Sequence, residues 1–161
     1  MTKEQFKILF DRYFDDIRRY LYYRSGDEAL STDLAQDAFM RIWEKDMVLM
    51  PGSDAGLLYK IAGDLFVSHT RREKLKREAP DRIRFQQSSR SPDEELEFKE
   101  LQEKYEKALA ELPENQRVVF LMSRMEELTY AEIAARLTLS VKAVEKRMTG
   151  ALARLKKEIN T

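Results

Sequence analysis

The sequence predicts an all-α protein made of two small helical domains joined by a flexible linker. Apolar residues recur at every third or fourth position through most of the chain, which is the period of an amphipathic helix. Glycine (5) and proline (4) are too scarce in 161 residues for the many turns of a strand-rich fold. Helical periodicity fades only in the polar stretch 78–90. We therefore expect domains at 1–76 and 98–161 and a linker at 77–97.

Three helices are expected in the first domain. The first contains the apolar positions from Phe6 to Leu21 and ends at the breaker 25–27, Ser-Gly-Asp. The second follows, and its Phe39 and Trp43 are expected to pack in the core. After the loop 50–56, with Ser53 as the expected N-cap, a third helix runs toward the basic cluster 71–77.

The second domain contains two capping boxes. SPDE at 91–94 places serine at the cap, proline at the first helical position and glutamate three residues after the cap. Pro113 separates this helix from the next one, which contains the apolar run 118–122. TYAE at 129–132 is the second capping box and begins a short helix.

The stretch LTYAEIAARLTLSVKAVEKRM, 128–148, has the pattern of a helix-turn-helix. Thr138 and Leu139 form the turn, and Ser140 caps the second, basic helix. The expected inner face consists of Ile133, Ala134, Leu137, Val141, Val144, Met148 and Leu152 or Leu155. The outer face suits a DNA major groove. Taken alone, the pattern is equally compatible with a helical hairpin whose lysines are solvated.

Composition excludes several functions. The chain has no cysteine and one histidine, His69, so neither a disulfide nor a metal site is expected. It has no nucleophile–base pair and no glycine-rich phosphate loop, so we expect no enzymatic activity and no cofactor. No apolar signal core or membrane-spanning run is present, and a cytoplasmic location is expected. Basic and acidic residues balance at 29 each, which is unusual for a free-standing nucleic-acid binder.

Four segments in this order resemble bacterial RNA polymerase sigma factors of the small extracytoplasmic-function (ECF) group. They are DLAQDAFMRIWE (33–44), LLYKIAGDLFVSHTRR (57–72), ELPENQRVVFLM (111–122) and the helix-turn-helix. The resemblance implies a transcription initiation factor that binds core RNA polymerase, directs it to promoters through their −10 and −35 elements, and aids promoter opening. The resemblance also explains the neutral net charge, because core polymerase would supply most of the contacts that hold the DNA.

The resemblance implies two contacts with core polymerase. The segment 33–44 would dock on the clamp helices of the β′ subunit, and the second domain would meet the β flap. The implied β′ contacts are Asp33, Gln36, Asp37, Arg41 and Glu44.

The family likeness further implies a −10 site on the loop 50–55 and the helix 57–72. The loop would receive a flipped base, and the helix would contact the opened strand through interleaved aromatic and basic residues. The candidates are Pro51, Gly52, Ser53, Tyr59, Lys60, Asp64, Arg71 and Arg72. For Tyr59, core packing is an equally good interpretation. Gly63 and Asp64 replace the arginine and asparagine common in the family. This replacement indicates either an unusual sequence preference at the −10 element or weaker melting of promoter DNA.

For the −35 element, the resemblance implies contacts from the second helix of the helix-turn-helix. The candidates are Ser140, Lys142, Ala143, Glu145, Lys146 and Arg147. Glu127 and Thr138 occupy turn positions that often hold glycine, and a left-handed Thr138 would be strained. Gly150 replaces a residue that is basic in many relatives.

The implied partners are core polymerase, promoter DNA and an inhibitory anti-sigma factor, which is often membrane-anchored in the family. The anti-sigma factor would bind between the two domains of the protein, which is expected to be a monomer when free. Two alternatives stay open. One is a free-standing, dimeric helix-turn-helix regulator that binds duplex DNA without polymerase. The other is an adaptor that binds polymerase but no longer recognises promoter sequences, and this alternative rests on Gly63, Asp64 and Gly150.

Overall fold

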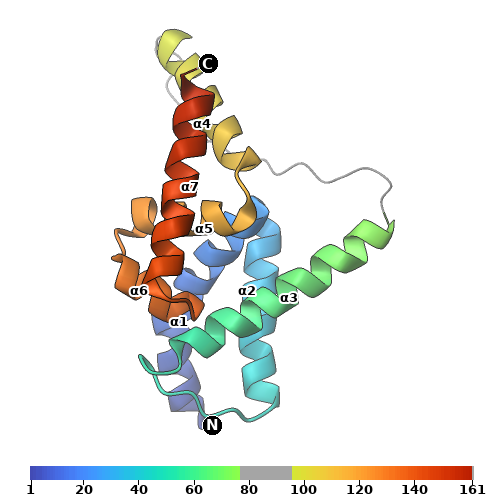
Figure 1. Ribbon diagram of the computed structural model, residues 1–161. Coiled ribbons are helices and arrows are strands. Elements are labelled where there is room, and N and C mark those ends of the chain that lie inside the picture. The colour runs from blue at the N-terminus through green and yellow to red at the C-terminus, as the bar shows by residue number, and fades with distance from the viewer. Residues whose placement is uncertain (77–95, 161) are drawn as a thin grey trace.

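The computed structural model describes residues 1–76 and 96–160, and within these ranges every regular element is an α-helix (Figure 1). The all-α prediction is therefore confirmed. The helices are α1 (Lys3–Ser25), α2 (Glu28–Glu44), α3 (Ala55–Lys76), α4 (Leu96–Glu111), α5 (Glu114–Glu126), α6 (Tyr130–Leu137) and α7 (Val141–Ile159). The capping box predicted at 91–94 and most of the predicted linker lie outside the described residues, and α4 already begins at Leu96.

Local sequence sets most helix ends. Gly26 ends α1 in the left-handed conformation (φ 69°), and the Asp27 side chain then caps α2, as the breaker predicted. The predicted cap of α3 is wrong. Asp54 directly precedes Ala55, and its carbonyl accepts from the Leu58 N–H, so Ser53 lies one residue too early.

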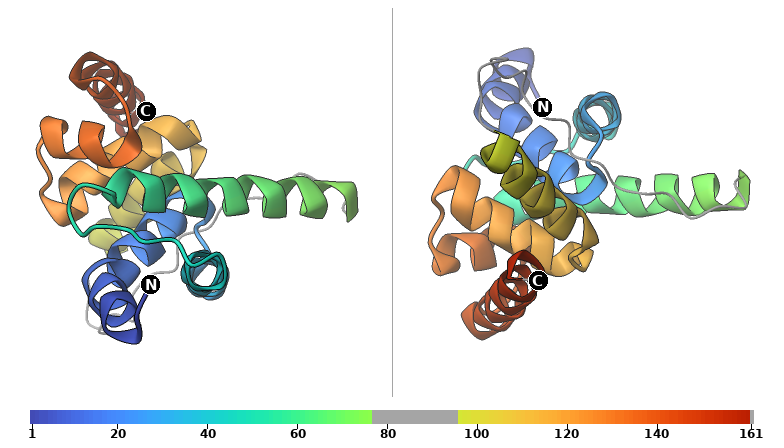
Figure 2. Two further views of the ribbon diagram at one scale, coloured as in Figure 1. Left: turned by 90° about the horizontal axis from the view of Figure 1, so that it is seen from below. Right: turned by 90° about the horizontal axis from the view of Figure 1, so that it is seen from above.

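The helices α1–α3 form the N-terminal unit, in which α1 packs against both α2 and α3. Its core contains Ile17, Leu21, Phe39, Ile42 and Leu58. Trp43 departs from the prediction because it is 37% exposed and rests edge-to-face on Phe6, with ring centroids 5.2 Å apart. The outer half of α3 projects sideways from the body of the molecule (Figure 2).

The helices α4–α7 form the C-terminal unit, in which α4, α5 and α6 all pack on α7. Ile133 and Ala134 of α6 face Val144 and Met148 of α7 in the core, as predicted for a helix-turn-helix. One predicted inner position is wrong, because Val141 is exposed; of the two alternatives Leu152 and Leu155, Leu155 is the buried one. Ala151, which was not predicted, joins Leu155 on the inner face, because α7 is long enough for its buried stripe to continue at 144, 148, 151 and 155.

The two units are in contact through α1 with α5 and through α3 with α6. Both views in Figure 2 show α5 and α6 beside the crossing of α1 and α3. Among the described residues, no helix combines the length and apolar character needed to cross a membrane.

Candidate nucleic-acid interface

The loop before α3 is held in shape by two short hydrogen bonds. The Gly52 N–H donates to the Tyr13 hydroxyl at 2.6 Å, and the Met50 N–H donates to Asp54 Oδ2 at 2.6 Å. Gly52 has φ 93°, which L side chains rarely adopt. Pro51, Gly52 and Ser53 therefore lie together at a fixed tip, with Gly52 and Ser53 exposed.

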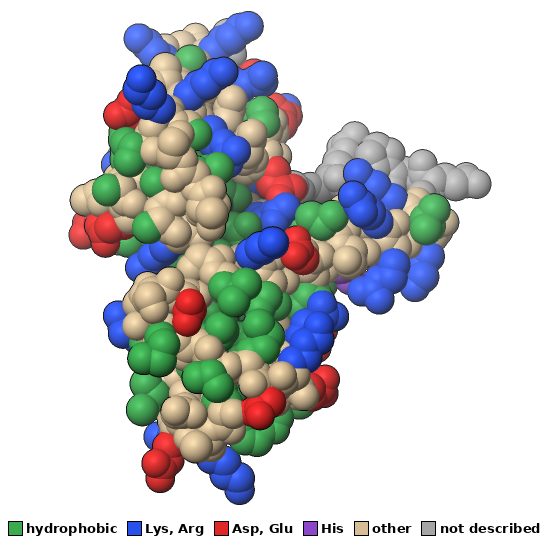
Figure 3. All heavy atoms as spheres, turned by 60° about the horizontal axis from the view of Figure 1, so that its bottom comes forward, with side chains coloured by type: hydrophobic (Ala, Val, Ile, Leu, Met, Phe, Trp, Pro, Cys, Tyr) green, Lys and Arg blue, Asp and Glu red, His purple; other side chains and the backbone are tan. Residues whose placement is uncertain are grey.

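The −10 candidates on α3 divide into two groups. Lys60, Asp64, Arg71 and Arg72 are exposed, and positions 60, 64 and 71 share one stripe of the helix. Basic side chains cluster on the projecting end of α3, and hydrophobic ones gather on the neighbouring face of the N-terminal unit (Figure 3). Tyr59 points inward and is only 2% exposed. Its ring packs against Tyr20 with centroids 5.1 Å apart, and burial raises the pKa of its hydroxyl.

Two of the unusual residues turn out to be packing positions. A Cβ on Gly63 would lie 2.9 Å from Arg24 Nη1 and 3.2 Å from the Tyr20 hydroxyl, so Gly63 faces α1 and not solvent. A Cβ on Gly150 would lie 2.6 Å from Gln116 Nε2 on α5. Of the residues that depart from the family pattern, Asp64 is therefore the one exposed on α3.

The polymerase candidates form a continuous stripe on α2. Asp33, Gln36, Asp37, Arg41 and Glu44 are all exposed and lie three or four residues apart. Met40, which sequence reasoning did not single out, lies within this stripe and is 50% exposed. Its spacing from Gln36 and Asp37 would have indicated it. We call these six residues the docking stripe.

The second helix of the helix-turn-helix, α7, begins with a formed cap, because Ser140 Oγ accepts the Ala143 N–H at 3.1 Å. Ser140, Lys142, Glu145 and Lys146 are exposed, whereas Ala143 and Arg147 are half-buried. Glu127 and Thr138 both adopt left-handed conformations, with φ of 54° and 57°.

A crevice of about 720 Å³ lies between the two units. Its lining includes Tyr59 and Lys60 of α3 and Arg147 of α7, so two −10 candidates and one −35 candidate face the same space. Gly56 and Arg136 also line it. The remaining candidates of the two groups lie on separate surfaces.

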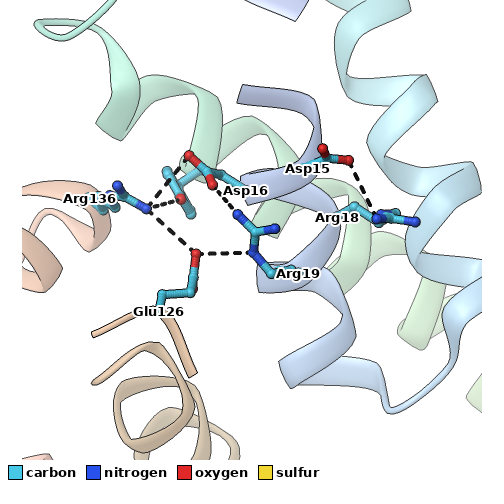
Figure 4. A network of polar contacts seen from close by, with 7 residues as sticks. Asp15, Asp16, Arg18, Arg19, Glu126 and Arg136 are labelled. Carbon is cyan, nitrogen blue, oxygen red and sulfur yellow. Dashed lines mark hydrogen bonds and ion pairs between the residues drawn. The ribbon is translucent and has the colours of Figure 1, made fainter. Parts of the chain in front are cut away.

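Beside the crevice, charged residues join the units (Figure 4). Arg19 Nε of α1 lies 3.3 Å from Glu126 Oε1 of α5 and also pairs with Asp16. Arg136 Nη1 of α6 lies 3.8 Å from both Glu126 Oε1 and Asp16 Oδ2. Burial raises the pKa of Glu126 despite the two arginines.

Arg117 of α5 is the second link and is 1% exposed. Its Nε donates to the Tyr23 carbonyl at 2.7 Å and its Nη2 to the Arg24 carbonyl at 2.8 Å, both at the C-terminal end of α1. Its Nη1 donates to the Leu112 carbonyl at 3.0 Å, just beyond α4. Sequence reasoning missed this role, although an arginine directly before the apolar run 118–122 was a visible signal.

Comparisons with known proteins agree with this architecture. Sigma-70 region 2 matches residues 9–75, and sigma-70 region 4 matches residues 102–155. The ECF RNA polymerase sigma factor SigM of Bacillus subtilis is 28% identical over 127 residues, which are 77% of this chain and 76% of SigM. The ECF RNA polymerase sigma factor SigE of Mycolicibacterium smegmatis is 28% identical over 137 residues, which are 83% of this chain but only 53% of SigE.

A solved structure has the same fold. The sigma factor RpoE of Bartonella quintana, in complex with the anti-sigma factor NepR, superposes with a TM-score of 0.69 at 22% identity and 97% coverage of both chains. The N-terminal unit corresponds to region 2 and the C-terminal unit to region 4. The chain therefore belongs to the sigma-70 family, as a two-domain factor of the ECF group.

Proposed function

We propose that this protein directs core RNA polymerase to specific promoters as an ECF sigma factor, with its N-terminal unit acting at the −10 element and its C-terminal unit at the −35 element. One observation carries the proposal. A region 2 unit with an exposed docking stripe and a projecting basic helix is followed, in the same chain, by a region 4 helix-turn-helix. The protein would act in the cytoplasm and contribute binding without chemistry of its own.

The docking stripe on α2 would bind the β′ clamp helices. Its polar residues are exposed together, and Met40 offers an apolar contact among them. A central apolar side chain inside a polar rim is a typical arrangement of a protein interface. The C-terminal unit would meet the β flap.

The fixed loop tip at 51–53 would receive the flipped base of the −10 element, and the exposed stripe of α3 would follow the opened strand. Lys60, Arg71 and Arg72 suit phosphates, and Asp64 suits a base amino group. Tyr59 would join them only when the C-terminal unit has moved away.

At the −35 element, the exposed start of α7 would enter the major groove. Ser140, Lys142, Glu145 and Lys146 would face the DNA directly, with Ala143 and Arg147 at the edge of the contact. As in the B. quintana complex, the free monomer would have an anti-sigma factor as its inhibitory partner.

Run-off transcription with purified bacterial core polymerase and genomic fragments of the host tests the proposal. Discrete transcripts that depend on the protein are expected. Asp37→Arg should weaken co-elution with core, whereas Lys146→Ala should leave co-elution intact and reduce promoter use. Co-elution without transcripts would support the adaptor, and DNA binding by a dimer without polymerase would support the free-standing regulator.

A further inference from the structure

The charged side chains of the crevice between the two units are mostly basic. Among the described residues that line it, one is a carboxylate and four are basic: Glu114 of α5 against Arg24 of α1, Lys60 of α3, Arg136 of α6 and Arg147 of α7. These residues come from both units and share one space only because the units pack together. A cleft lined by charges of one sign concentrates the electrostatic field inside it, so this crevice attracts anions.

Two of the four basic residues are already neutralised. Arg24 forms an ion pair with Glu114 through its Nε. Arg136 lies between Asp16 and Glu126, which belong to α1 and α5 and do not line the crevice (Figure 4). Neither Arg24 nor Arg136 therefore adds much net attraction for a further anion.

Lys60 and Arg147 are the positive charges without a counter-ion. No ion pair or hydrogen bond joins either of them to another residue within the described ranges. Arg147 is nevertheless half-buried, so its guanidinium is less well hydrated than on an open surface. Because the two like charges face the same space, they also repel each other. An anion between them would remove this repulsion and accept a charge-assisted hydrogen bond from each.

The crevice has room for a ligand much larger than a phosphate ion. Its volume of about 720 Å³ lies within the range of roughly 300–1,000 Å³ that small-molecule sites occupy. Besides the cations, its lining contains the apolar side chains of Val118 and Leu137 and the exposed amide of Asn115. An apolar wall beside an amide suits the face and the hydrogen-bonding edge of a planar heterocyclic base.

We propose that the crevice binds a nucleoside di- or triphosphate, with its phosphates between Lys60 and Arg147 and its base toward Val118, Leu137 and Asn115. The ligand contacts both units at once and stabilises the contact between them. This site goes beyond the proposed function, because nucleotide binding requires neither polymerase nor DNA. A free nucleotide is favoured over a DNA strand because both cations face a crevice of limited volume and not an open surface.

Isothermal titration calorimetry on the full chain, without divalent cations, tests the site with ATP, GTP and inorganic triphosphate as probes. We expect saturable binding of ATP or GTP at one site. Inorganic triphosphate should bind about tenfold more weakly or worse, because it makes no contact in place of the base. The nucleotide that binds, at a hundredfold excess over its Kd, should raise the Tm by about 5–10 °C.

Substitutions locate the ligand. Lys60→Met and Arg147→Met should each weaken nucleotide binding about tenfold, through loss of one charge-assisted hydrogen bond. Lys74→Met and Arg154→Met are the matched controls, because they remove the same charges from exposed positions of the same two helices outside the crevice. Asn115→Lys should tighten binding by adding a cation to the lining, a gain that misfolding cannot produce. Circular dichroism would confirm that each variant keeps its helices.

The outcomes separate this site from the proposed function. A lack of saturable binding by both nucleotides, or equal losses in the crevice variants and their controls, would overturn the site. Equal affinity for inorganic triphosphate would overturn the assignment of a nucleotide. Single-stranded DNA that binds the free protein through Lys60 and is not displaced by nucleotide would assign the crevice to DNA instead. Nucleotide binding without run-off transcripts would support the site and count against the sigma-factor function, and transcripts without nucleotide binding would do the reverse.

Discussion

Arg136 donates a hydrogen bond from Nη1 to the hydroxyl of Tyr59 at 3.1 Å, and the two residues are 77 positions apart in the chain. The bond joins α6, the first helix of the helix-turn-helix, to α3, the helix proposed to contact the −10 element. The same guanidinium lies 3.8 Å from Glu126 and from Asp16, so one side chain connects α6 with α1, α3 and α5.

Replacing Tyr59 with phenylalanine should loosen the contact between the units. The ring would still pack against Tyr20, but Arg136 would lose a buried acceptor, which costs about 0.5–1.5 kcal/mol. The free energy of unfolding by urea should fall by about the same amount. Tyr105→Phe on α4, which packs on α7, is the control and should change nothing. Equal unfolding free energies for Tyr59→Phe and wild type would mean that the bond contributes no net stability.

Thr138 should be more stable as glycine. It ends α6 with φ 57° and ψ 49°, a conformation that costs a β-branched residue about 1–2 kcal/mol. Glycine adopts it freely but gains entropy in the unfolded chain, so the net gain should be up to about 1 kcal/mol in the free energy of unfolding. Chemical denaturation measures this. Thr138→Ala keeps the Cβ and should show little or none of the gain; a gain as large in alanine would point to the lost hydroxyl and away from backbone strain.

The features that the sequence predicted best are those set by interactions within short segments of the chain. Gly26 and Asp27 ended and restarted helices as expected, and the Thr129–Glu132 capping box formed with both of its hydrogen bonds. In these cases the residues that bond are at most four positions apart, so their spacing in the chain carries the information. The polar stripe of α2 was predictable for the same reason.

The contact between the units could not be predicted in this way. Tyr59, Arg117 and Arg136 find their partners 77 to 94 positions away, and no periodic pattern specifies a partner at that distance. Gly63 and Gly150 looked like altered DNA contacts because a family pattern marks positions without saying which way they face. Only the packing shows that both glycines lie against a neighbouring helix.

The capping box of α6 should make stability depend on pH. Glu132 accepts from the Thr129 N–H at 3.1 Å, and this backbone hydrogen bond lowers the pKa of the carboxyl group. Because the folded pKa is lowered, the stabilisation is present above the ordinary carboxyl pKa and is lost as the pH falls through the folded value. Wild type should therefore exceed Glu132→Gln in unfolding free energy at pH 7, and the gap should close in acid. A gap that stays constant with pH would show that charge plays no part.

Lys146 should contribute to promoter affinity through phosphate attraction. It is exposed on α7, one turn beyond Lys142. Lys146→Ala in the reconstituted holoenzyme should weaken binding to all promoters alike and reduce the salt slope of log K by about 1. Lys157→Ala, near the far end of the same helix, is the control. A loss confined to certain promoter sequences would instead indicate a contact of Lys146 with a base edge.

Arg117 should resist even a conservative substitution. Its guanidinium donates to carbonyls at the ends of two helices, one in each unit, and it is almost completely buried. Lysine has a point charge and a different donor geometry, so Arg117→Lys would leave at least one buried carbonyl without a donor. Hydrogen bonds to a charged group contribute about 1.5–3 kcal/mol each, so we expect a loss of about 2–4 kcal/mol in the free energy of unfolding by urea. Arg124→Lys is the matched control, because Arg124 lies on the same helix and is exposed. Energy transfer between dyes attached at Asp11→Cys on α1 and Ala131→Cys on α6 should fall as well in Arg117→Lys, since the α1 carbonyls belong to the other unit. If stability fell while transfer stayed high, the bond beyond α4 would be the important one, and the link to α1 would be incidental.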